Sequence, residues 1–179
     1  MVGSPCSPHG AETGTDSSDH LSKLRTVTER SLTQKTWSEL EPIEVYGIAK
    51  LRTDVFFVEQ KVDEEELDWR DVEPTTVHLF IKDGRNVLAY LRVLHDEVAE
   101  HGGAHRVIGR VVVDRAHRGE GLARILLGRA TDLFGDEPML LHAQSYIAPL
   151  YVRAGFEAFG EEYVEAGIPH ISMLRPPSA

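Results

Sequence analysis

Residues 111–123 read VVVDRAHRGEGLA, and this stretch decides the fold. The three β-branched valines predict a buried strand, Gly119 and Gly121 predict a tight turn, and the apolar spacing after them predicts an amphipathic helix. The first N–H groups of a helix lack partners inside it, and the helix dipole adds positive potential there. Arg118 adds a guanidinium that is suited to phosphate oxygens. We therefore predict that residues 118–123 bind a phosphate group.

Two other phosphate-binding loops share part of this pattern, and neither fits. A P-loop requires Lys and then Ser or Thr after its last glycine, whereas Leu122 and Ala123 follow Gly121. A dinucleotide-binding turn requires a third small residue, and Arg124 stands at that position. A plain tight connection between a strand and a helix remains the alternative.

Hydrophobic periodicity and turn residues predict the elements around this stretch. Pro42 suits the first turn of a helix, and Asp83-Gly84 is the turn of a hairpin. The predicted elements are helix 41–58, strands 76–82, 87–95 and 106–113, helix 119–134, strand 139–144, helix 149–154, and strands 156–159 and 171–174. This order predicts an α/β fold in which helices flank a mixed sheet.

The two ends of the chain differ in composition. Residues 1–34 are rich in Ser, Thr, Gly, Pro and His and lack apolar periodicity, so we predict a disordered N-terminal tail. Residues 35–179 are predicted to form one domain that needs no disulfides. Within this domain, the acidic run 63–71 contains Leu67 and Trp69, which fits either a solvated loop or a lip that faces a substrate.

Composition limits the class of function. A net charge of −10 would repel a phosphate backbone, so no nucleic-acid partner is expected, and it weakly favours a cationic partner such as an amine. The single cysteine, Cys6, excludes an internal disulfide and a zinc–thiolate site. The chain lacks an apolar stretch of roughly 20 residues and a secretory pattern, so we expect a cytoplasmic protein that binds no membrane.

The segment between residues 95 and 105 contains side chains that could suggest a metal: Asp96, Glu97, Glu100, His101 and His105. Gly102-Gly103 predicts a flexible loop there rather than a rigid set of ligands. No metal is therefore expected.

Two signatures resemble one known family. Arg118-x-x-Gly121-x-Ala123 after a valine-rich strand resembles the cofactor signature of the GCN5-related N-acetyltransferases. About 30 residues later, the segment LYVRAGF at 150–156 resembles that family's Leu-Tyr-x-x-x-Gly-Phe segment. The stretches VFFVEQ at 55–60 and GIPHISM at 167–173 are similar to those of the ElaA-like subgroup. The resemblance spans roughly residues 35–175.

The resemblance implies a central mixed, mostly antiparallel sheet flanked by helices, with acetyl-CoA as co-substrate. Gln144 departs from the pattern, because many members have Asn at that position. The residues that would bind the cofactor are Val111, Val112, Val113, Arg118, Gly119, Glu120, Gly121, Leu122, Ala123, Gln144 and Tyr151.

The implied reaction is direct attack of a neutral amine on the thioester, which requires a base, an oxyanion donor and an acid. By the resemblance, Tyr151 protonates the departing thiolate and the Val113 N–H binds the oxyanion. The base is open between Glu59, His142 and a bound water. His170 is expected to line the acceptor side.

Other functions remain open at this point. An acyl-CoA sensor without catalysis would need residues 118–123 but not Tyr151. An acyl-homoserine-lactone synthase shares an Arg-x-x-Val-Phe stretch like Arg52-x-x-Val55-Phe56. Such an enzyme would be expected to have a basic docking patch for a carrier protein, which is not evident in this acidic chain. The acceptor can be a small-molecule or peptide amine, and the protein a monomer or a homodimer.

Overall fold

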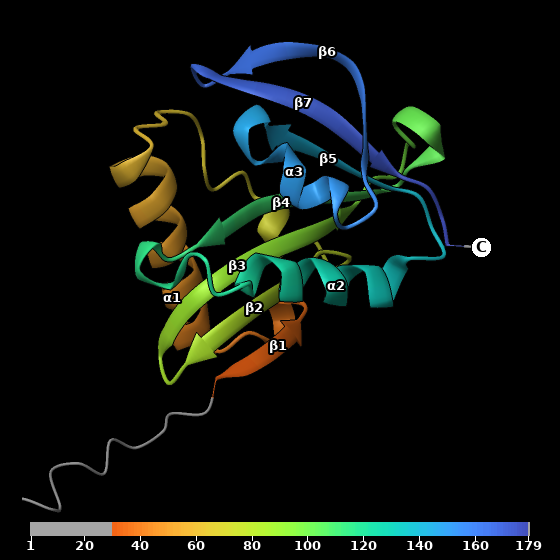
Figure 1. The fold of residues 1–179 in the computed structure, drawn as a ribbon. Helices are drawn as coiled ribbons and strands as arrows, with labels where there is room; N and C mark the ends of the chain where they lie inside the picture. The colour runs from red at the N-terminus through yellow and green to blue at the C-terminus, as the bar shows by residue number, and fades with distance from the viewer. Residues whose placement is uncertain (1–29, 179) are drawn as a thin grey trace, which may run out of the picture.

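The computed structural model describes residues 30–178 of the chain. Its centre is a seven-stranded sheet in the order β1-β2-β3-β4-β5-β7-β6 (Figure 1). The strands are β1 (Ser31–Lys35), β2 (Val77–Asp83), β3 (Asn86–His95), β4 (Arg106–Val113), β5 (Met139–Gln144), β6 (Glu157–Glu165) and β7 (Ile168–Arg175). Within this part of the chain β4 and β5 pair in parallel and all other neighbours are antiparallel. The sheet is therefore mixed and mostly antiparallel, as predicted.

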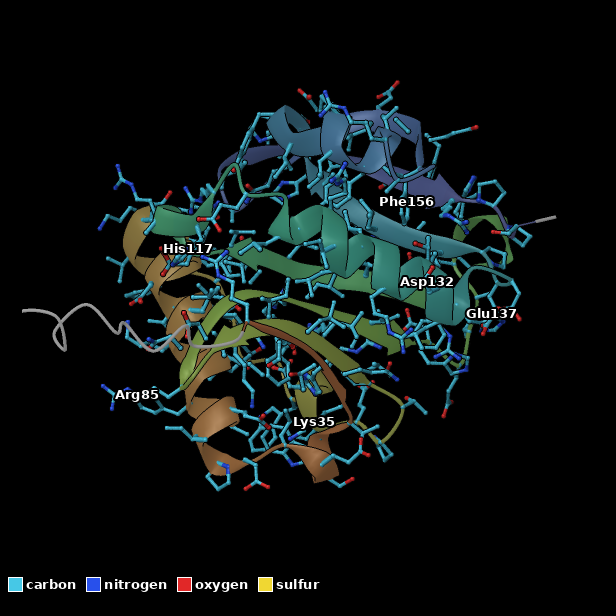
Figure 2. All side chains as sticks on the ribbon, turned by 60° about the horizontal axis from the view of Figure 1, so that its bottom comes forward. Lys35, Arg85, His117, Asp132, Glu137 and Phe156 are labelled. Carbon is cyan, nitrogen blue, oxygen red and sulfur yellow. The ribbon has the colours of Figure 1, made fainter. Side chains whose placement is uncertain are left out.

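Helices cover both faces of this sheet. They are α1 (Pro42–Arg52), which continues into a π-helical turn (Thr53–Glu59), α2 (Leu122–Phe134) and α3 (Ala148–Val152). Successive residues of a strand point to opposite faces, so Leu79 packs in the core beneath α2 whereas Phe80 packs against α1. Figure 2 shows α2 lying across its face of the sheet, with His117 in the turn before the helix and Asp132 on the helix itself. Among residues 30–178 no helix is both long enough and apolar enough to cross a membrane.

The folded domain begins earlier than predicted. Residues 31–34 belong to β1, which pairs with β2 from Ser31 opposite Lys82 to Lys35 opposite His78. The predicted boundary after residue 34 is wrong for these four residues, and residues 1–29 of the predicted tail lie outside the described residues. β1 is an edge strand that stays largely exposed, so it lacks the apolar periodicity that would reveal a strand.

The last hairpin is also longer than predicted. Strands were expected at 156–159 and 171–174, but β6 and β7 extend the pairing out to Glu165 opposite Ile168. Most of β6 is exposed, so backbone pairing rather than an apolar face holds the extension together.

β4 and β5 separate towards their C-terminal ends. Their pairing is confined to three residue pairs, the last of which is Ile108 with Leu141. A bulge in β4 follows at once, because the β3–β4 register shifts there and Arg110 has a φ of 55°. A bulge bends its strand. Residues 109–113 of β4 and 142–144 of β5 therefore face one another without pairing, and we call this stretch the β4–β5 divergence.

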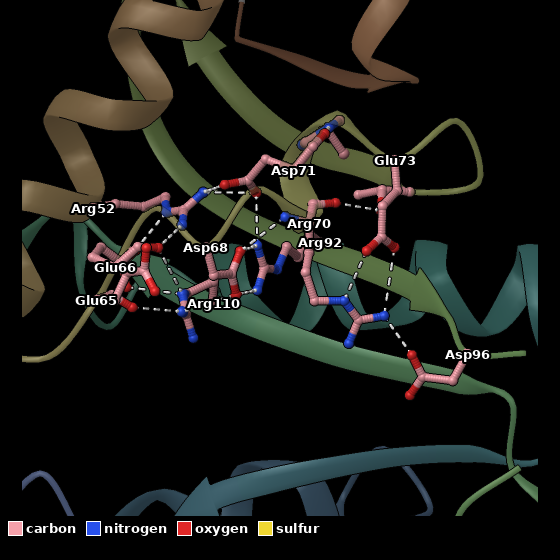
Figure 3. A network of polar contacts seen from close by, with 12 residues as sticks. Arg52, Glu65, Glu66, Asp68, Arg70, Asp71, Glu73, Arg92, Asp96 and Arg110 are labelled. Atoms are coloured by element: carbon pink, nitrogen blue, oxygen red, sulfur yellow. Dashed lines mark hydrogen bonds and ion pairs between the residues drawn. The ribbon is translucent and has the colours of Figure 1, made fainter. Parts of the chain in front are cut away.

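A buried ionic network holds the acidic run against the sheet (Figure 3). Its members are Arg52, Arg92, Arg110, Glu66, Asp68 and Asp71. Arg52 and Arg92 are each 2% exposed, and both donate to the carboxylate of Asp71 at 2.9 Å. The run is thus an anchored loop rather than a solvated one. Leu67 and Trp69 still project to solvent, so a substrate-facing role for these two stays a prediction.

Candidate active site

The turn 118–123 has the backbone geometry that anion binding requires. Gly119 and Gly121 have φ values of 84° and 80°, and a Cβ at either position would meet no atom within 4 Å. α2 begins at Leu122, and no side chain caps its start. A helical hydrogen bond runs from the Ile125 N–H to the Gly121 carbonyl at 3.1 Å. The three amides before Ile125 therefore have no partner inside the helix and are open to an anion.

Arg118 is bound by Glu59. Its two terminal nitrogens donate to the two carboxylate oxygens at 2.6 and 2.9 Å, and its Nε donates to the Val113 carbonyl at 3.3 Å. The hydrogen bonds from Arg118 lower the pKa of Glu59. A carboxylate with a lowered pKa is a weaker base. Glu59, the first predicted base, thus lies against the anion-binding turn as the partner of its arginine.

A second carboxylate lies on the same turn. Glu120 contacts Arg30, and its Oε1 lies 3.1 Å from Nδ1 of His117. The amides of the turn therefore have carboxylates near them in addition to Arg118. A phosphate group that arrives at the turn would compete with Glu59 for the guanidinium.

The edge of β4 that faces the divergence has free backbone groups. The Asp114 N–H donates to the Leu88 carbonyl of β3 at 2.8 Å. Because the N–H groups of a strand alternate between its two edges, those of Val113 and Val111 point away from β3, towards β5. The side chain of Val112 is buried against α1, so its role is packing.

β5 places two predicted site residues on the face opposite α2, since the residues that alternate with them pack in the α2 core. His142 follows the last β4–β5 pair, and its Nδ1 lies 3.0 Å from Ser172 Oγ and 2.9 Å from the Tyr163 hydroxyl. Gln144 exchanges two hydrogen bonds with Gln60, at 3.1 and 3.2 Å. This exchange ties the end of the π-helical turn to the end of β5.

Tyr151, the predicted acid, lies in the core on the α2 face. It is 5% exposed, and its ring packs edge-on to Phe156 at 6.3 Å between centroids. Burial, and to a lesser degree Tyr146, raises the pKa of Tyr151. The phenol therefore keeps its proton at neutral pH, as a general acid must. Tyr151 and His142 approach the sheet from opposite faces.

The structure thus gathers most of the predicted residues into two groups and leaves Tyr151 apart from both, in the core on the α2 face. Residues 111–123 and Glu59 form the anion-binding end, and His142, Gln144 and His170 lie together on β5 and β7. The partners Gln60, Ser172 and Tyr163 had no assigned role, because only long-range pairing brings them to the site. No cluster of three or more metal-ligating side chains occurs within residues 30–178.

Comparisons with known proteins agree with this geometry. A profile of the acetyltransferase (GNAT) domain family matches residues 47–175. The protein ElaA of Escherichia coli K12 is 35% identical over 143 residues, which cover 77% of this chain and 91% of that protein. A UPF0039 protein of Mycobacterium tuberculosis is 38% identical over 150 residues, which cover 81% of this chain and 93% of that protein.

Solved structures give the same answer. An acyl-CoA N-acyltransferase from Pseudomonas aeruginosa is 41% identical, with a TM-score of 0.72 over 81% of this chain and 99% of that chain. Escherichia coli ElaA is 32% identical, with a TM-score of 0.74 over 82% of this chain and 99% of that one. The acyl-homoserine-lactone synthase LasI, at 15% identity and a TM-score of 0.63 over 82% of this chain and 89% of that one, shares the fold alone. The matched domain and these relatives show that the chain belongs to the GNAT acyltransferase family, in its ElaA-like subgroup.

Proposed function

We propose that the protein transfers an acetyl group from acetyl-CoA to a primary amine, which attacks the thioester directly in a ternary complex. One observation carries this proposal: the open turn 118–123 follows β4 after residues 114–117, and the free N–H groups at the end of that strand point into the β4–β5 divergence. A pyrophosphate on the turn would leave the pantetheine arm running along that edge. The thioester would then lie at the divergence.

Each group in the proposed reaction has a role that fits its surroundings. The Val113 N–H is directed at the divergence and is the proposed donor to the oxyanion. Tyr151 is the proposed acid for the departing thiolate, because its raised pKa keeps the phenol protonated. His142 is the proposed base in place of Glu59, because Glu59 is paired with Arg118. The amine would then enter from the face opposite α2.

The test of this function is Tyr151→Phe. Thiol release from acetyl-CoA is first screened against small amines and a lysine-containing peptide. With an accepted amine, the variant is expected to lower kcat by about 10- to 1,000-fold, the usual contribution of a general acid. Its affinity for coenzyme A, measured by calorimetry, should change little, because the hydroxyl acts on the leaving group rather than on binding.

Tyr46→Phe is the matched control, since Tyr46 is an exposed residue of α1 and should not affect turnover. Wild-type turnover in Tyr151→Phe would show that the acid is elsewhere. Absence of coenzyme A binding by the wild-type protein would remove the proposed function itself.

A further inference from the structure

The imidazole of His142 is held on one nitrogen and left accessible on the other. Nδ1 contacts the hydroxyls of Tyr163 and Ser172, and the Tyr163 ring stacks on His170 with 5.9 Å between centroids. A hydroxyl can accept as well as donate, so Nδ1 can carry the ring proton. The lone pair on Nε2 is then free.

That free nitrogen faces a carboxylate. Nε2 lies 3.8 Å from Oε2 of Glu100, which is longer than a hydrogen bond, and both side chains are close to half exposed. The Nε2 lone pair and the carboxylate oxygen are two hydrogen-bond acceptors that lie next to the same region of solvent. A single nitrogen with several N–H groups can donate to both of them.

The loop that carries Glu100, predicted to be flexible, is hydrogen-bonded within itself and packs on β6. The Glu100 N–H donates to the Ala104 carbonyl at 3.0 Å, and Ala104 is fully buried. The neighbouring His101 stacks on Phe159 with 3.9 Å between centroids. The carboxylate of Glu100 therefore extends towards His142 from a hydrogen-bonded backbone.

The position of this pair matches the proposed reaction. His142 is the first residue of β5 beyond the last pair with β4, so it lies where the divergence opens. Its titratable contacts are Glu100 and Tyr163, and His170 of β7 stacks on the Tyr163 ring. Glu165 and Glu100 both add to the effect of burial in raising the pKa of Tyr163, so the surroundings are anionic and the phenol stays protonated.

From this geometry we infer that Glu100 and His142 together bind the acceptor as an ammonium ion and deprotonate it in place, with Tyr163 as the positioning residue for His142. The inference rests on the proposed function and assigns its substrate class. The acceptor is an aliphatic amine that is cationic at neutral pH, rather than an arylamine that is already neutral.

The reaction forms one N–C bond, breaks one C–S bond and releases one proton to solvent. The ammonium donates one N–H to Glu100 and gives another proton to Nε2 of His142, which frees the nitrogen lone pair. The N–C bond forms at the thioester carbonyl, and collapse of the oxyanion breaks the C–S bond. The thiolate takes the proton of Tyr151, the amide nitrogen returns its extra proton to Tyr151 through water, and His142 releases its proton to solvent.

The first experiment follows the ring signals of His142 by NMR in protein loaded with coenzyme A. Titration with n-butylammonium should shift those signals, and aniline at the same concentration should not. In Glu100→Gln the affinity for n-butylammonium should fall about tenfold, in the range of a hydrogen bond to a charged group. Glu97→Gln is the matched control, because it removes an exposed carboxylate from the same loop.

The second experiment separates binding from chemistry. With butylamine and acetyl-CoA, Glu100→Gln should raise the amine KM about tenfold with kcat within about twofold. His142→Gln should lower kcat/KM by about 100- to 10,000-fold and flatten its acid limb, since the base is gone. Tyr163→Phe keeps the aromatic ring that stacks on His170 and removes only the hydroxyl. It should lower kcat/KM by less than His142→Gln does. Each variant should keep the wild-type Tm within about 2 °C, because these side chains are partly exposed.

The results that overturn the inference are distinct from those that overturn the function. Coenzyme A binding without any shift of His142 by butylammonium removes the ammonium site. Equal losses in Glu97→Gln and Glu100→Gln, or turnover confined to arylamines, do the same. Failure to bind coenzyme A removes the proposed function, and titration of the unloaded protein with n-butylammonium then tests the ammonium site by itself.

Discussion

Glu59 and Glu120 lie at the turn that is proposed to bind the pyrophosphate of coenzyme A. Nearby anions oppose a phosphate group, so the unpaired amides of α2 and the guanidinium of Arg118 must outweigh them. The glycines contribute by leaving the approach to those amides free of Cβ atoms. Affinity at this turn is therefore a balance that single substitutions can shift in either direction.

Gly121→Asp should weaken binding of coenzyme A at least about 100-fold, because a like charge beside the phosphate costs several kcal/mol. Calorimetry measures this loss. Gly128→Asp is the control, since it adds the same charge to an exposed position of α2 with open space around it. An equal loss in both variants would assign the effect to the charge of the helix rather than to the turn.

Glu59→Gln should tighten binding of coenzyme A by about two- to fivefold. The substitution removes the carboxylate that occupies Arg118, and an exposed ion pair is worth roughly 0.2–1 kcal/mol. Asp54→Asn, in the same π-helical turn and paired with Lys50, should leave the affinity unchanged. Weaker binding in Glu59→Gln would mean that the carboxylate positions the arginine instead of competing for it.

At the scale of elements, the ionic network fixes the loop between the π-helical turn and β2. Arg52 comes from α1 and Arg92 from β3, and both bind Asp71 in that loop (Figure 3). Trp69 lies within the loop with a φ of 63° and is 79% exposed. A bulky residue rarely adopts that conformation. The bonds of Asp68 and Asp71 on either side of it hold the backbone there.

Asp71→Asn should lower the free energy of unfolding by about 3–5 kcal/mol. The reason is that two buried guanidinium groups would lose their shared countercharge. Urea denaturation measures the change. Asp132→Asn on the exposed side of α2 should stay within about 0.5 kcal/mol of the wild type. A small effect in Asp71→Asn would show that water or Asp68 compensates for the lost charge.

The same network should make the fold sensitive to acid. Burial alone would raise the pKa of Asp68, but Arg92 and Arg110 lower it from 3.8 to about 2. The pKa of Glu44, paired with Lys35 and Lys82, is likewise lowered against burial from 4.5 to about 2. A carboxylate whose pKa is depressed by folding contributes stability above its unfolded pKa and loses it as pH falls through the folded pKa.

We therefore expect the stability from Asp68 and Glu44 to be complete above about pH 5 and to be lost between about pH 4 and 2. Denaturation midpoints measured across this range test the expectation. Glu44→Gln should be less stable than the wild type at neutral pH and should show a shallower decline towards pH 2. An unchanged slope would mean that Glu44 titrates alike in the folded and unfolded states.

At the scale of the whole molecule, β1 forms one edge of the sheet. Five residue pairs join β1 to β2, and Lys35 in β1 is paired with the buried Glu44 of α1. β1 thus pairs with the backbone of β2, which would otherwise be the edge strand, and contacts the first helix.

Removal of residues 1–29 should leave Tm within about 2 °C of the full chain. Removal of residues 1–35 should lower it by at least about 5 °C, because an entire edge strand and two ion pairs, Arg30–Glu120 and Lys35–Glu44, are lost. Differential scanning calorimetry of the two truncated chains tests this boundary. Equal Tm values would show that β1 contributes little to the fold.

Local sequence patterns were sufficient to predict β3, β4, β5 and α2, because the buried residues of each follow the period of a strand or a helix. The bounds of β5, Met139 and Gln144, were predicted to the residue. The elements β1 and the outer part of β6 were not predicted as strands, because they are mostly exposed and held by backbone pairing. The turn 118–123 was predicted because its glycines and arginine are adjacent in the chain.

The sequence alone determined the family, the mixed sheet class, most strands and helices, and the open turn, because the signatures and periods that predict them are local in the chain. The tertiary structure alone decided that Glu59 pairs with Arg118, that Gln60 meets Gln144, and that Glu100 faces His142. These pairs are 59, 84 and 42 residues apart in the sequence. No local period encodes such separations, since they arise only when sheet register and strand divergence bring distant elements together.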